Sequence, residues 1–94
     1  MRQYELMVIV HPDVAEDGLA NTVETVRQWA SAAGEVVKID NWGRRRFAYP
    51  IRNLQEGNYI LFNVQLEPVA VAELERNLGL SEEVLRHLLV RLDD

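Results

Sequence analysis

The stretch NYILFNVQLEP, residues 58–68, decides the fold of this chain. Its apolar side chains occupy every second position, at Ile60, Phe62, Val64 and Leu66. A period of two is that of a β-strand with one buried face. Pro68 follows at once, and its fixed φ suits the first turn of a helix. The stretch therefore predicts a half-buried strand that leads into a helix.

The residues that begin the chain predict a strand followed by a helix. Residues 4–10 alternate with one wholly apolar parity, which suits a central strand. Asp13, with Glu16 three residues later, resembles a capping box at a helix start. Gly34 stands where the C-terminal cap of that helix is expected. The apolar stripe between these ends consists of Leu19, Val23, Val26, Ala30 and Ala33.

The rest of the chain supplies two more strands and a second helix. Residues 35–49 predict a strand, in which Gly43 is expected to mark a bulge. Residues 50–57 predict a loop. A short helix is expected to end at Gly79, and residues 84–92 predict the last strand.

The order of elements is thus β-α-β-β-α-β, which predicts an α+β fold. Two βαβ units in one small sheet require right-handed crossovers and place both helices on one face. This is the ferredoxin-like sandwich, a four-stranded antiparallel sheet with strand order 4-1-3-2. We expect one domain over residues 1–94, with residues 35–49 and 84–92 as its edge strands.

The composition limits the cellular location and the kinds of binding partner that we expect. The chain has no cysteine and a net charge of −5, which disfavours non-specific attraction of the whole surface to nucleic acid. The apolar run in MRQYELMVIV is too short to span a membrane, so we expect a cytoplasmic protein and no membrane partner.

Three consecutive arginines lie on the expected edge strand. Arg44, Arg45 and Arg46 belong to a run of nine residues, ending at Arg52, that contains no Asp or Glu. Charge on an edge guards against pairing with other sheets, which is one interpretation. The single sign favours another, because guanidinium groups suit phosphate and carboxylate recognition. The nearby aromatic residues, which could stack on RNA bases or simply pack, are Trp42, Phe47 and Tyr49.

A second basic area is predicted where the first and last strands neighbour each other. Arg2 and Tyr4 open the first strand, and Arg86, His87 and Arg91 lie on or near the last. Taken singly, each is most often a solvated surface residue. Together they make RNA binding a reasonable hypothesis.

Catalysis is not indicated. His11 and His87 are the only acid-base candidates for neutral pH, and they are far apart in the sequence. No His, Asp and Glu cluster has the spacing of a metal site, and no glycine-rich phosphate loop occurs. We therefore expect no enzyme, no cofactor, no metal and no small-molecule substrate.

Four segments resemble the bacterial small-subunit ribosomal protein S-six family. They are MRQYELMVIVHPD, GRRRFAYPI, EGNYILFNVQLEP and VLRHLLVR, and they match in order and spacing over nearly the whole chain. The opening R-x-Y-E and the R-R-x-A-Y-P-I block are the most specific parts.

The resemblance implies a function. The family has the ferredoxin-like fold, resides in the small ribosomal subunit, and binds the central domain of small-subunit ribosomal RNA. It does so as a heterodimer with ribosomal protein S-eighteen, and it has no enzymatic activity. The predicted RNA-binding residues are Arg2, Tyr4, Arg86 and Arg91, and the predicted partner- or RNA-binding residues are Arg44, Arg45, Arg46 and Tyr49.

A second class of function stays open. Small sensing or regulatory domains use the same fold and dimerise through the sheet face that carries no helices. The residues expected on that face are partly apolar: Glu5, Met7, Ile9, Tyr59, Leu61 and Asn63. A stable dimer that ignores RNA would favour this alternative.

Overall fold

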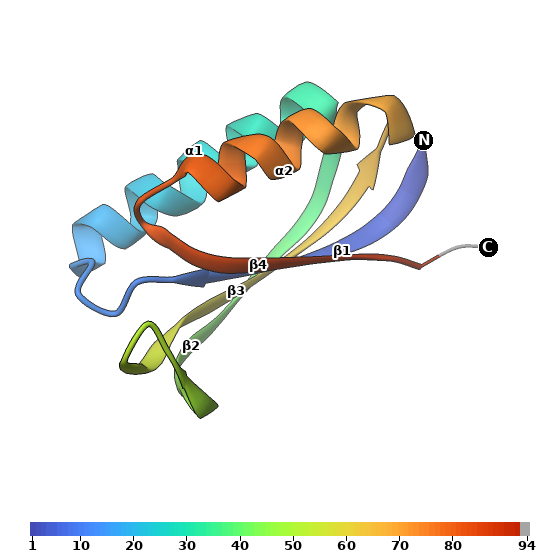
Figure 1. The fold of residues 1–94 in the computed structure, drawn as a ribbon. Coiled ribbons are helices and arrows are strands. Elements are labelled where there is room, and N and C mark those ends of the chain that lie inside the picture. The colour runs from blue at the N-terminus through green and yellow to red at the C-terminus, as the bar shows by residue number, and fades with distance from the viewer. Residues whose placement is uncertain (93–94) are drawn as a thin grey trace.

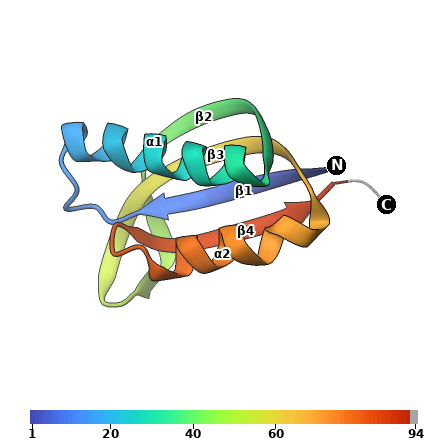
Figure 2. The same cartoon turned by 90° about the horizontal axis from the view of Figure 1, so that it is seen from above.

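A computed structural model describes residues 1–92 and shows two helices lying on one face of a four-stranded sheet (Figures 1 and 2). The elements are β1 (Arg2–Val10), α1 (Glu16–Ala33), β2 (Gly34–Ile51), β3 (Leu54–Leu66), the 3-10 turn η1 (Pro68–Ala70), α2 (Val71–Leu80) and β4 (Val84–Arg91). The sheet order is β2-β3-β1-β4 and every pairing is antiparallel. The predicted ferredoxin-like topology is therefore confirmed, with β2 and β4 as the edges.

The core lies between the helices and the inner strands. β1 and β3 pair in register, so that Leu6 lies opposite Phe62 and Val8 opposite Ile60. These four side chains are almost fully buried. Because neighbours directly opposite each other share a face, the alternation read from residues 58–68 places the whole apolar set under the helices.

Helix α1 begins differently from the prediction. Its N-cap is Ala15, and no side chain caps it, so the predicted capping box at Asp13 is wrong. The backbone N–H of Asp13 instead donates to Nδ1 of His11 at 3.1 Å. Asp13 belongs to the turn that follows β1, where this local bond competes with a cap.

The predicted end of α1 at Gly34 is confirmed, although for another physical reason. The φ angle of Gly34 is 166°, an extended conformation that any residue adopts. A Cβ atom at this position would stand 2.0 Å from the carbonyl oxygen of Gln65. Glycine is needed because the first residue of β2 passes directly against β3.

The hairpin between β2 and β3 is longer than predicted. The loop expected over residues 50–57 is wrong, because the strands continue to the pair Ile51–Leu54. The turn consists of Arg52 and Asn53, whose φ angles are 52° and 64°. Two residues with positive φ match the twist of a tight hairpin. The end of the hairpin extends away from the helices (Figure 1).

Bulges bend the outer strand β2. The bulge predicted at Gly43 is confirmed by a register shift between Asn41 and Gly43 and by a φ of 82°. The side-chain oxygen of Asn41 accepts a 2.8 Å hydrogen bond from the Gly43 N–H. Further shifts lie between Val36 and Lys38 and between Arg46 and Ile51. The parity of β2 relative to β3 therefore changes three times along its length.

Candidate nucleic-acid and partner interface

The outer strand β2 carries the three consecutive arginines, which we call the arginine border (Arg44–Arg46). All three side chains are exposed. β2 has a paired neighbour only on its β3 side, so the border stands on an open sheet edge. Successive residues of a strand point to opposite faces of the sheet. Arg45 therefore points to one face, and Arg44 and Arg46 point to the other.

Arg44 is partly engaged within the protein. Its Nη1 lies 2.8 Å from Oε1 of Glu56 on β3, and its Nη2 donates to the carbonyl oxygen of Pro12. The contact with Glu56 links the two strands of the hairpin, and the contact with Pro12 attaches the hairpin to the segment between β1 and α1. Arg44 therefore has a structural role, and its charge is offset by one carboxylate.

Arg45 and Arg46 are the more available members of the border. The guanidinium of Arg45 lies 5.2 Å from the ring centroid of Trp42, a cation–π contact that leaves its N–H donors exposed. Nη2 of Arg46 lies 3.4 Å from the side-chain oxygen of Gln55, a long and uncharged contact. Neither guanidinium is paired with a carboxylate among residues 1–92.

Tyr49 lies near the end of the hairpin and is 82% exposed. Phe47, two residues earlier, instead packs beside Tyr59 with ring centroids 6.2 Å apart. The hairpin thus presents the exposed ring of Tyr49 close to the arginine border in the chain, and the role of this ring in partner or RNA binding stays a prediction.

The second basic area is not one patch, and that expectation is wrong. Arg91 lies opposite Tyr4 and Arg86 opposite Ile9. The two arginines are five residues apart on β4, roughly 16 Å along the strand, and their parity puts them on opposite faces. Arg2 pairs with Leu66 and lies at the same end and on the same face as Arg91. Arg2 and Arg91 form one site, and Arg86 stands apart.

Two further members of that area point into the protein. Tyr4 is only 7% exposed and belongs to the core, so its ring contributes packing. Its alternation with Leu6 and Val8 could have indicated this burial. His87 faces the helices, with Nε2 3.4 Å from Oε1 of Glu75 on α2.

The arrangement offers no catalytic cluster in the described chain. Among residues 1–92, no group of three or more His, Cys, Asp or Glu side chains is placed to hold a metal ion. The nearest carboxylate of His11 is that of Asp13, at 3.9 Å, and the partner of His87 is Glu75 on another element. No helix of the described chain is long and apolar enough to cross a membrane.

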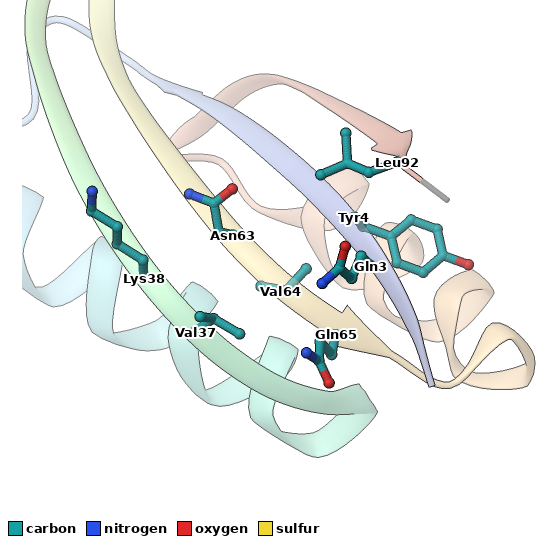
Figure 3. Close-up of a pocket in the computed structure, with 8 residues that line it drawn as sticks. All are labelled: Gln3, Tyr4, Val37, Lys38, Asn63, Val64, Gln65 and Leu92. Carbon is teal, nitrogen blue, oxygen red and sulfur yellow. The ribbon is translucent and has the colours of Figure 1, made fainter. Parts of the chain in front are cut away.

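The helix-free face of the sheet, which we call the open face, carries features that the sequence did not reveal. It is formed by the expected set of Glu5, Met7, Ile9, Tyr59, Leu61 and Asn63, together with Gln3, Gln65, Arg86, Leu88 and Val90. Trp42 and the apolar residues of β1, β3 and β4 line one hollow of about 210 Å³ on this face. A second hollow of about 320 Å³ lies toward the chain ends (Figure 3).

These features describe a small α+β sandwich whose exposed groups suit the binding of anionic or protein surfaces. The family model described as Ribosomal protein S6 matches residues 3–91. The small ribosomal subunit protein bS6 of Carboxydothermus hydrogenoformans is 40% identical, with 99% of this chain and 98% of that protein covered. The bS6 protein of Acidothermus cellulolyticus is 48% identical over the same shares.

A solved structure agrees with the sequence relatives. The crystal structure of 30S ribosomal protein S6 from Thermotoga maritima superposes with a TM-score of 0.92 at 31% identity, covering 97% of this chain and 87% of that one. The chain belongs to the ribosomal protein S6 family. It is accordingly a protein of the small ribosomal subunit and of the cytoplasmic ribosome.

Proposed function

We propose that the chain is a structural constituent of the small ribosomal subunit that binds the central domain of small-subunit ribosomal RNA. It does so as a heterodimer with ribosomal protein S-eighteen and performs no chemistry. Family membership supports this proposal. The observation that carries it is the arginine border, because Arg45 and Arg46 are exposed on an open edge and have no carboxylate partner within residues 1–92.

The border suits both predicted partners. Guanidinium groups bind phosphates and carboxylates through paired N–H donors, and an open strand edge offers backbone groups to a second chain. Arg45 and Arg46 point to opposite faces, so one edge can meet RNA on one side and protein on the other. Tyr49 adds an exposed ring that can stack on a base or cover an apolar contact.

The terminal site of Arg2 and Arg91 supplies a second contact with the phosphate backbone. Both side chains are exposed at the end of the sheet where the chain begins and where β4 ends. Arg86, on the open face at the other end of β4, is a separate contact. The two places lie at opposite ends and on opposite faces of the sheet, so one RNA molecule touching both must also pass around the sheet edge.

The test is a binding measurement with a central-domain RNA fragment, with and without S-eighteen. We expect the partner to raise the affinity for RNA. The double substitution Arg45→Glu with Arg46→Glu should reduce the affinity at least tenfold while the circular dichroism spectrum stays unchanged, since both side chains are on the surface. The matched control is Arg76→Glu on α2, an exposed arginine away from the border. Equal affinity of all three proteins would refute the proposal.

A dimeric sensing domain is the second candidate. The observation in its favour is the exposure of Leu88, Val90 and Trp42 on the open face, at 56%, 44% and 45%. A face of this kind is commonly an interface. Light scattering separates the two: a dimer that does not bind RNA favours the sensing domain, and a monomer that binds RNA with S-eighteen favours the ribosomal function.

A further inference from the structure

Three carboxamide side chains gather on the open face near the chain ends. Gln3 on β1 lies directly opposite Gln65 on β3, and Asn63 follows two residues along on the same face. Together they line the hollow of about 320 Å³. Figure 3 shows the two glutamine side chains next to each other on adjacent strands, with Asn63 beyond them. None of the three forms a side-chain hydrogen bond within residues 1–92.

The walls of this hollow are apolar. Val37 stands on the β2 side and Leu92 on the β4 side (Figure 3). Val37 is the extra residue of the bulge between Val36 and Lys38, and it is 60% exposed. A bulge commonly turns a side chain toward a functional surface. Leu92 is held in place because its N–H donates to the carbonyl oxygen of Gln3 at 2.9 Å.

The charges around the hollow disfavour an anion inside it. Lys38, which lines the hollow, is paired with Asp40 at 3.5 Å, and Glu5 lies opposite Asn63 on the same face. The terminal site of Arg2 and Arg91 lies at this end of the sheet but on the other face, because neighbouring residues of a strand point to opposite faces. Phosphate binding therefore belongs at the arginines, and the hollow suits a neutral group with donors and acceptors.

We infer that the hollow binds one unpaired base of the RNA, with adenine preferred. A carboxamide offers one donor and one acceptor side by side, and both edges of adenine present the complementary pair. Val37 and Leu92 cover the apolar surface of the base. A volume of about 320 Å³ is at the small end of ligand pockets, which suits a single base. This inference rests on the proposed RNA-binding function.

The first test uses the whole chain and small probes. We expect adenosine monophosphate to shift the side-chain NH₂ resonances of Gln3, Asn63 and Gln65 in ¹⁵N-resolved spectra. Ribose 5-phosphate, which lacks the base, should leave them in place, and uridine monophosphate should shift them less. Equal shifts with adenosine monophosphate and ribose 5-phosphate, or none with either, would overturn the inference.

The second test uses the complex with S-eighteen and the central-domain RNA. Dimethyl sulfate should fail to modify one unpaired adenine in the complex and modify it again when Gln3→Leu and Gln65→Leu are combined. Affinity should fall about tenfold, the effect of losing a paired base contact. Gln28→Leu, an exposed glutamine on α1, is the control and should change neither result.

The outcomes separate the two proposals. If dimethyl sulfate modifies the RNA identically with the wild-type protein and with the double-leucine variant, the hollow does not bind a base. That result would not contradict the proposed RNA-binding function. If the wild-type protein does not bind RNA even with S-eighteen, the proposed function fails, and the titration with adenosine monophosphate still decides whether the hollow binds a base.

Discussion

At the scale of single residues, the structure explains why two glycines differ in importance. A Cβ at Gly34 would stand 2.0 Å from a backbone oxygen of β3, whereas a Cβ at Gly79 would meet nothing within 4 Å. Backbone atoms cannot move aside as a flexible side chain can. Gly34 therefore allows the start of β2 to lie close against β3 directly after α1 ends. Gly79 is a replaceable residue inside α2.

Gly34→Ala should lower the free energy of unfolding by about 1–3 kcal/mol, the usual cost of overpacking. Gly79→Ala should raise it by up to about 1 kcal/mol, because alanine favours a helix over glycine. Urea unfolding measures both. A neutral Gly34→Ala would show that the approach of β2 to β3 is not the reason for the glycine.

The ion pair of Glu24 and Arg27 on α1 predicts a small pH dependence. Arg27 donates to both oxygens of Glu24, at 2.8 Å for Nε and Oε1, and these hydrogen bonds lower the pKa of the Glu24 carboxyl below its ordinary value. The pair therefore stabilises the fold above the unfolded-state pKa, and the effect is lost as pH falls through the folded-state pKa. It is exposed, so the effect is small.

NMR titration of the Glu24 carboxyl checks this directly. In Arg27→Gln the pKa of Glu24 should rise toward its ordinary value, and the stability difference between the two proteins should shrink in acid. An unchanged pKa would mean that the pair does not form in solution.

At the scale of elements, the β2–β3 hairpin shows what could be predicted and what could not. The strand at residues 58–67 and the bulge at Gly43 follow from alternation and from a glycine that permits positive φ. The bulge at Val36–Lys38 contains no glycine, so nothing in the sequence predicts it. The hairpin turn was missed because Arg52 and Asn53 lack the glycine that usually marks it, although asparagine tolerates positive φ.

Parts of the candidate site that are consecutive in the sequence could be predicted. Parts that depend on how the strands pair could not. The arginine border is contiguous in the sequence, so its place on an edge strand followed from the strand order. The separation of Arg86 from Arg2 and Arg91 depends on register between β1 and β4. The carboxamide cluster joins Gln3 on β1 to Asn63 and Gln65 on β3, which lie 60 and 62 positions further along the chain, so no local pattern reveals it.

Arg44 should hold the hairpin to the body of the protein. Arg44→Gln removes the contacts to Glu56 and Pro12, so amide protons of the hairpin should exchange faster. The cost in global stability should be about 1 kcal/mol or less, since the pair is exposed. Arg46→Gln, with only its long contact to Gln55, is the control. Equal exchange in both variants would contradict a tether at Arg44.

At the scale of the whole molecule, charge is segregated. The net charge is −5, and seven of the fifteen acidic residues lie on the helices and the segment after α2: Glu16, Asp17, Glu24, Glu73, Glu75, Glu82 and Glu83. Seven of the nine arginines lie on the strands or at their ends, and Arg27 and Arg76 lie on the helices. In the proposed function the basic edge faces the RNA, so the isolated acidic protein should bind RNA weakly and a basic partner should strengthen the complex.

The most direct test is the salt dependence of RNA binding by the complex with S-eighteen, measured for the wild-type protein and for Arg45→Glu with Arg46→Glu. Each arginine on a phosphate should contribute about one unit to the slope of log K against log salt concentration. The account predicts weaker binding and a shallower slope for the double variant. The same affinity and the same slope for both proteins would contradict it.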